Sequence, residues 1–348
     1  MYFRMTRLFP SEFFGSEELP NTTFHFSDSK ARIRFGDPEQ GDETPSDRRV
    51  VCEVTIERQP GKSVVEVLEN IAAGFYDQEC KEFQAGWIRK RQAGETRGGC
   101  CLPWDVLPQA YKDFFAEISK KMNTLVINTC NTLKWVTGAW WLHSRLIGST
   151  TEWSVDGTKW NILPSKIVIG SVSWSAGLSW SADEMDEVKK MVESGESEPL
   201  AHELLREAVG LRPEYPDVAL IMAVSAAEIG IKQYIGRSQP ETEWLIENMP
   251  SPDILRMLRE YIPKIKPQNE FLGRVVIPEN SILSKLKKAV PNRNRLIHVG
   301  ETKHTHEDLD ALLSCVSDLL YLLDYYSGRD WALGHLSESS LLELGVDA

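Results

Sequence analysis

Cysteine is scarce and irregularly placed in this chain. Only six of the 348 residues are cysteine, and no two have the C-x-x-C spacing of zinc sites and redox motifs. They lie at Cys52, Cys80, Cys100, Cys101, Cys130 and Cys315. This pattern argues against both a disulfide framework and a zinc centre, so we interpret the six residues as reduced thiols. We expect no metal and no cofactor.

Long apolar runs are also missing. No stretch approaches the roughly 18 uncharged apolar residues that a membrane span requires. The first residues, MYFRMTRLFPSEFF, lack the continuous apolar core of a signal peptide. The first half contains no Walker loop, nucleotidyltransferase motif or Gly-x-Ser-x-Gly elbow. The sequence therefore predicts a cytoplasmic protein with no membrane partner, and it assigns no chemistry to the first half.

Positive charge is in the minority but is concentrated in one window. The net charge of the chain is −12, which disfavours contact with a polyanion. Residues 256–295, however, hold ten basic and three acidic residues, a local charge of +7. The basic residues are Arg256, Arg259, Lys264, Lys266, Arg274, Lys285, Lys287, Lys288, Arg293 and Arg295. Such a run is either a solvated face or an RNA-binding surface, and we take Lys285, Lys287, Lys288 and Arg295 as candidate RNA contacts.

That window leads into the hexapeptide Arg-Asn-Arg-Leu-Ile-His at residues 293–298. Asn294 and His298 lie four residues apart, so on a helix they share a face. Arg293 lies about 140° round the helix from His298. One helix therefore cannot easily close both side chains over one phosphate, whereas two copies in a dimer could.

Arginine and histidine together suit RNA cleavage without a metal. Arginine offers a planar fork of donors to phosphate oxygens, and histidine transfers protons near neutral pH. The 2′-hydroxyl would attack the adjacent phosphorus while arginine holds the developing charge. The alternative is ordinary surface charge beside a hydrogen-bonded imidazole.

Two long apolar helices are expected around the hexapeptide, at Pro216–Ile235 and Thr305–Tyr326. The first carries Glu228, which we expect to be buried, and Lys232 one turn later. A long helix with Glu-x-x-x-Lys, then Arg-Asn-x-x-x-His, then a leucine-rich helix resembles the HEPN family of helical nucleic-acid-processing domains. The resemblance covers about residues 199–332.

The resemblance implies a metal-independent endoribonuclease that acts as a homodimer. It implies phosphate binding and charge stabilisation by Arg293, proton transfer by His298, and orientation of the histidine or the substrate by Asn294. Glu228 and Lys232 would support the site. HEPN domains include toxins and anti-phage effectors, and some members have lost activity and serve as dimerisation modules.

The first half is typical of an α+β domain with a largely antiparallel sheet. The expected strands are Thr22–Phe26, Ala31–Phe35, Val50–Glu57, Thr124–Asn128 and Ile167–Trp174, with helices at Ser63–Tyr76 and Val106–Met122. Ser63 and Glu66 are expected to form the capping box that opens the first of these helices. A two-residue turn at Asp156-Gly157 predicts a hairpin that pairs Trp153 with Trp160.

Nine of the eleven tryptophans precede residue 181. They are either core packing or a recognition face that stacks bases, sugars or a partner's aromatic groups. The segment Gly138–Arg145 is one candidate for such a surface. We therefore interpret residues 1–192 as a Trp-rich recognition or sensor domain for a regulatory ligand or protein.

Residues 193–348 are the expected all-α, HEPN-like bundle. Its first helix is expected at Glu198–Leu211, and shorter helices at Gln239–Phe271. Pro291 predicts a kink or restart that holds Arg293 at a helix start, where backbone N–H groups favour phosphate. His304 and His306 are interpreted as solvent-exposed residues near a helix cap formed by Thr305 and Asp308, rather than as metal ligands.

The sequence leaves three functions open: a ribonuclease, a non-catalytic HEPN interaction module, and a subunit that holds RNA without cutting it. The first two differ in where the motif lies. A catalytic Arg293 and His298 must be exposed in a basic cleft, whereas a structural pair would be buried against Glu228 or backbone carbonyls.

Overall fold

The computed structural model describes residues 1–9, 31–36, 50–72, 107–138, 148–163, 182–248, 253–269 and 273–346. The chain divides into two compact units, Met1–Cys130 with Ser144–Glu196, and Asn131–His143 with Ser197–Ala348. The predicted boundary at 192/193 lies four residues before this division. The sequence did not predict that residues 131–143 belong to the second unit.

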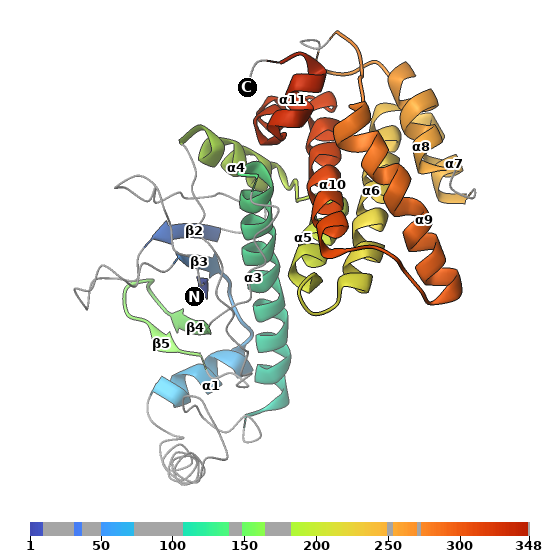
Figure 1. Cartoon of the computed structure of the whole chain (residues 1–348). Helices are drawn as coiled ribbons and strands as arrows, with labels where there is room; N and C mark the ends of the chain where they lie inside the picture. Colours follow the sequence, from blue (N-terminus) through green and yellow to red (C-terminus); the bar gives the residue numbers. More distant parts are fainter. Residues whose placement is uncertain are drawn as a thin grey trace, which may run out of the picture. The chain divides into compact units, whose positions relative to one another are not determined.

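The first unit combines an antiparallel sheet with helices, so the fold class is α+β (Figure 1). The strands are β1 (Tyr2–Phe9), β2 (Ala31–Gly36), β3 (Val50–Glu57), β4 (Gly148–Ser154) and β5 (Asn161–Ile162). Their order in the sheet is β2-β3-β1-β4-β5, and each neighbouring pair is antiparallel. The helices are α1 (Lys62–Ala72), α4 (Ala182–Ser194) and the part of α3 (Gln109–Val136) that precedes Asn131.

The predicted strands β2 and β3 are confirmed, but the central strand β1 was missed. Phe3 and Met5 are buried while Tyr2, Arg4 and Thr6 are half-buried, which is the alternation of a strand with one covered face. The ring of Phe3 packs edge-on against Phe114 of α3, with ring centroids 5.2 Å apart. The predicted strands at 22–26 and 167–174 lie outside the described residues.

The predicted strand at Thr124–Asn128 is wrong, because this segment lies inside α3. Tyr111, Ile118, Met122 and Val126 are buried at spacings of seven, four and four residues, which is the repeat of one helix face. The segment around Val126 contains β-branched residues, which favour strands. It is helical because Val126 continues the buried face of the preceding turns.

The hairpin at 152–161 exists, but its turn differs from the prediction. Six residues separate β4 from β5, and Trp153 pairs with Asn161 rather than with Trp160. The Asp156 carboxylate accepts hydrogen bonds from the backbone of Thr158 and Lys159, which stabilises this wider loop. The helix α1 begins at Lys62, so Ser63 lies within it and is not its N-cap.

The second unit is helical in its described part. Its α-helices are α5 (Leu200–Leu211), α6 (Pro216–Ser238), α7 (Glu243–Asn248), α8 (Ile254–Arg256), α9 (Ser284–Val299), α10 (His306–Tyr326) and α11 (Glu338–Leu344). Short 3₁₀ turns lie at η2 (Pro240–Thr242), η4 (Ile262–Lys264) and η6 (Asp330–His335), and π turns at η3 (Met257–Tyr261) and η5 (Glu279–Leu283). The predicted long helices and the short helices between them are confirmed.

The helix α6 is the centre of this unit and packs against α5, α9 and α10 (Figure 1). By length and composition it is apolar enough to cross a membrane, and 56% of its most apolar window is buried within the fold. Gly230 permits its close approach to α10. A Cβ at this position would lie 2.2 Å from Cδ2 of Leu320.

Candidate active site on helix α9

The helix α9 has two functionally different faces. Leu286, Ala289 and Val290 are buried at helical spacing, and Arg293 continues this inner face one turn later. The outer face carries Lys287, Asn294 and His298, which are exposed and lie within about 40° of one another round the helix. The sequence motif is therefore divided between an inner arginine and an outer amide and imidazole.

Arg293 is held by a residue far away in the sequence. Its Nη2 lies 3.0 Å from Oε2 of Glu228 on α6, and its Nη1 donates to Oδ1 of Asn294 at 3.0 Å. The side chains of Arg293 and Glu228 are 19% and 28% exposed. Glu228 is thus half-buried rather than buried as expected, because it lies at the edge of the α6–α9 contact. Lys232, one turn later, is half-buried.

A catalytic motif should be exposed and a structural one buried, and the two key residues of the motif differ in this respect. His298 and Asn294 are exposed, as expected for a catalytic motif. Arg293 is paired with Glu228, as expected for a structural motif. The structure thus brings Arg293, Asn294 and Glu228 together. It places His298 about 140° away from Arg293 on the same continuous helix.

Pro291 does not restart the helix as predicted. It lies inside α9, which begins at Ser284 directly after the π turn η5, so Arg293 is mid-helix and receives no free backbone N–H groups from a helix start. The packing of Leu286, Ala289 and Val290 keeps the helix continuous through the proline. The helix ends at Gly300, whose φ of 76° is the left-handed conformation that favours glycine.

Several cations of the basic window are paired with acids. Arg256 with Glu260, and Arg259 with Glu279, form ion pairs of 3.0 and 2.6 Å. Arg295 lies 3.0 Å from Glu301. The lysines of α9 remain as candidate phosphate contacts, with Lys287 and Lys288 exposed and Lys285 half-buried.

The turn between α9 and α10 was predicted in part. Thr305 and Asp308 form the reciprocal capping box at the start of α10, which confirms the predicted cap. His306 is exposed, as expected. His304 is not, because its side chain is largely covered and its Nδ1 lies 2.7 Å from Oγ1 of Thr302.

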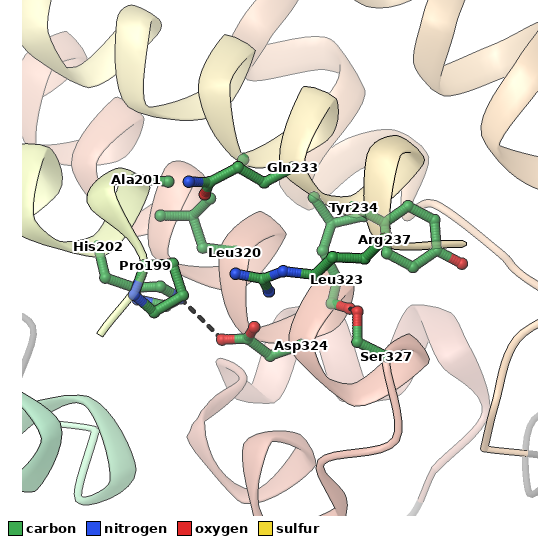
Figure 2. A pocket seen from close by; sticks show the side chains of 11 residues that line it. Pro199, Ala201, His202, Gln233, Tyr234, Arg237, Leu320, Leu323, Asp324 and Ser327 are labelled. Carbon is green, nitrogen blue, oxygen red and sulfur yellow. Dashed lines mark hydrogen bonds and ion pairs between the residues drawn. The ribbon is translucent and has the colours of Figure 1, made fainter. Parts of the chain in front are cut away.

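A second polar cluster, which the sequence did not predict, lies between α5 and α10 (Figure 2). Oδ2 of Asp324 lies 2.8 Å from Nε2 of His202 and accepts a 2.7 Å hydrogen bond from the indole of Trp135. Arg329 lies 3.5 Å from the other carboxylate oxygen and stacks over Trp135. Burial raises the pKa of Asp324, but these cationic and hydrogen-bonding partners outweigh it and hold the pKa below its usual range.

Asp324 and His202 line a pocket with Gln233, Arg237 and Ser327 (Figure 2). The cavity volume is about 10 Å³, which is the space of a single water molecule. A nucleotide does not fit in that space, so the cluster is best explained as the polar core of the unit. The one feature of the sequence that could have predicted this cluster is Asp324, an acidic residue among the leucines of α10.

A buried ion pair adjoins this core. Arg206 of α5 forms a two-pronged contact with Glu198, and both side chains are buried. Burial lowers the pKa of Arg206 to about 10, so the guanidinium stays charged at neutral pH. Cys315 of α10 and Cys130 of α3 are buried free thiols, as predicted for these two residues.

Comparisons of the chain with protein-family models, with curated proteins and with solved structures found no match. The HEPN resemblance therefore rests on the residues of α6, α9 and α10 alone.

Proposed function

We propose that the protein is a metal-independent endoribonuclease whose catalytic side chain is His298. The observation that supports this most is the exposed face of α9, on which His298 and Asn294 lie in line with Lys287. An exposed imidazole can reach a substrate proton, and the lysine supplies attraction for an adjacent phosphate. The helices α5, α6, α9 and α10 would then be a HEPN-like bundle.

The proposed reaction is attack of the 2′-hydroxyl on the adjacent phosphorus. His298 removes the hydroxyl proton as the new P–O bond forms, and the bond from phosphorus to the 5′-oxygen breaks. The 5′-oxygen takes up a proton from water and His298 returns its own proton to water, which leaves a 5′-hydroxyl on one product and a 2′,3′-cyclic phosphate on the other. Arg293 would bind the nonbridging phosphate oxygens, where negative charge develops.

A homodimer is part of this proposal, because Arg293 and His298 project from different sides of α9. A second copy of the chain can place its own α9 so that the arginine of one protomer and the histidine of the other face one phosphate. Ile297 and Val299 flank His298 on its two sides round the helix, and both are large apolar side chains, 50% and 61% exposed, that a second copy could cover.

We place this activity in the cytoplasm, as a toxin or defence effector controlled by the first unit. The recognition role of that unit stays a proposal. Two of the tryptophans for which the structure describes side chains are core residues, Trp153 in the first unit and Trp135 in the second. Trp160 is half-buried beneath Arg4, whose guanidinium carbon lies 4.2 Å from the ring centroid. Residues 139–145 of the candidate surface lie outside the described part of the chain.

A non-catalytic interaction module is the second candidate, and the ion pair of Arg293 with Glu228 favours it. Product analysis separates the two. We expect the purified protein to cut an RNA oligonucleotide in EDTA and to leave cyclic-phosphate ends. The same oligonucleotide with 2′-O-methyl groups should remain intact, because its nucleophile is blocked. Cleavage of the blocked RNA would contradict the proposed reaction, and an intact unblocked RNA would favour the interaction module.

A further inference from the structure

Both terminal nitrogens of Arg293 make a hydrogen bond inside its own protomer. Nη2 is paired with Glu228, Nη1 donates to Asn294, and Nε is buried with no hydrogen-bond partner in the described structure. An arginine that binds phosphate must present this same fork of N–H groups to the ligand. The conformation of the free protein therefore leaves Arg293 unready for the role that the proposed function gives it.

The pair with Glu228 is situated so that it can open. Both side chains retain solvent access, at 19% and 28% exposure, so neither charge is stranded in the core if the contact breaks. The same helix carries two exposed lysines, Lys287 on the outer face and Lys288 about 100° from it, which attract a polyanion to α9. An RNA bound there brings several phosphates close to Arg293 at once, whereas a single phosphate ion gains only one contact.

We propose that Glu228 is a displaceable latch on Arg293. Its carboxylate occupies the phosphate-binding edge of the guanidinium in the free protein, and an RNA phosphodiester must replace it before the site is complete. This inference rests on the proposed role of Arg293 in binding RNA. It assigns Glu228 a function opposite to simple support, because Glu228 holds down phosphate affinity until a polyanionic substrate competes for Arg293.

Chemical labelling tests the latch without any cleavage. Phenylglyoxal modifies accessible guanidinium groups, and peptide mass spectrometry reports the rate at Arg293. We expect slow labelling in the wild type and labelling several times faster in Glu228→Gln and Glu228→Ala. A 2′-O-methyl RNA should protect Arg293 in both variants. The matched control is Glu301→Gln, which removes the acid paired with Arg295 at the same 3.0 Å distance and should leave labelling of Arg293 unchanged.

Binding of the same 2′-O-methyl RNA gives the second readout. We expect Glu228→Gln to bind it about tenfold more tightly than the wild type, a difference of about 1.4 kcal/mol. The exposed Glu301→Gln control should gain about twofold or less, because exposed pairs contribute little. The double variant Glu228→Gln/Arg293→Ala should lose the gain.

Three results would overturn the latch: equal labelling of Arg293 in wild type and Glu228→Gln, equal gains in affinity from Glu228→Gln and Glu301→Gln, or no protection of Arg293 by RNA. Weaker RNA binding by Glu228→Gln would show that Glu228 positions Arg293 instead of blocking it. These outcomes are separable from the proposed catalysis. If Glu228→Gln speeds labelling of Arg293 but the protein does not cut RNA, the site binds RNA without cleaving it. If the protein cuts RNA but labelling of Arg293 is unchanged, only the latch is refuted.

Discussion

The indole Nε1 of Trp135 donates a 2.7 Å hydrogen bond to Oδ2 of Asp324, although 189 residues separate them in the chain. The same carboxylate oxygen binds His202, and the hydroxyl of Tyr321 donates to the backbone carbonyl of Trp135 at 3.2 Å. The last turns of α3 are thereby built into the polar core of the second unit. This explains why Trp135 is buried and is not available as part of a recognition face.

Asp324→Asn should destabilise the second unit strongly. Loss of the charge leaves His202 and Arg329 beside a neutral amide in a buried site, and breaking such a cluster costs about 3–5 kcal/mol. Urea unfolding of the full chain, followed by circular dichroism, measures the effect. Asp310→Asn is the matched control on the same helix, because Asp310 pairs with Arg212 at an exposed site and should cost less than about 1 kcal/mol. Equal losses would contradict the assigned role of the cluster.

The stabilising effect of Asp324 should disappear in acid. Its pKa is lower in the folded protein than in the unfolded chain, where an aspartate titrates near about 3.9. Stability from this group is therefore fully present above about pH 4 and is lost as the pH falls through the folded-state value. The difference in unfolding free energy between wild type and Asp324→Asn should shrink below about pH 4. A difference that stays constant from pH 7 to 3 would refute this assignment.

Two glycines of α6 should respond oppositely to alanine. At Gly236 the nearest atom to an added Cβ is 3.9 Å away, so alanine fits and should stabilise the helix by up to about 1 kcal/mol. At Gly230 the added Cβ would meet the buried Leu320 at 2.2 Å, and the resulting overpacking should cost about 1–3 kcal/mol. Thermal unfolding of both variants tests this pair. A stabilised Gly230→Ala would show that α6 and α10 are not closely packed there.

The lysines of α9 should contribute unequally to RNA binding. Lys287 shares the face of Asn294 and His298, Lys288 lies about 100° away, and Lys285 lies on another side of the helix and is half-buried. Charge reversal to glutamate should therefore weaken binding of a 2′-O-methyl RNA in the order Lys287, Lys288, Lys285. Fluorescence anisotropy at several salt concentrations measures affinity and the number of phosphate contacts. The reverse order would move the RNA to a different face of α9.

Helical periodicity was sufficient to locate α5, α6 and α10, because long apolar faces dominate their sequences. It also held the information that Arg293 faces inward, since Leu286, Ala289 and Val290 precede it at helical spacing. The spacing within the hexapeptide alone does not reveal that orientation. Pro291 does not interrupt the helix, because the buried residues that precede it, Leu286, Ala289 and Val290, hold α9 against the rest of the unit.

Contacts between residues that are distant in the chain could not be predicted from local sequence patterns. Nothing local links Trp135 to Asp324, or Arg293 to Glu228, because these pairs depend on how the helices of the second unit pack against one another. The strand β1 was missed for a different reason. Its alternation of Phe3 and Met5 with polar neighbours is short, and the first residues were considered only as a possible signal peptide.

Cleavage of total RNA and tRNA in EDTA, by wild type and by His298→Ala, tests the central claim most directly. His306→Ala is the control, because His306 is an exposed histidine at the start of α10 outside the proposed site. We predict that wild type and His306→Ala cut RNA and leave cyclic-phosphate ends, and that His298→Ala does not. Equal cutting by all three proteins would contradict the assignment of His298. No cutting by any of them would contradict the proposed ribonuclease activity.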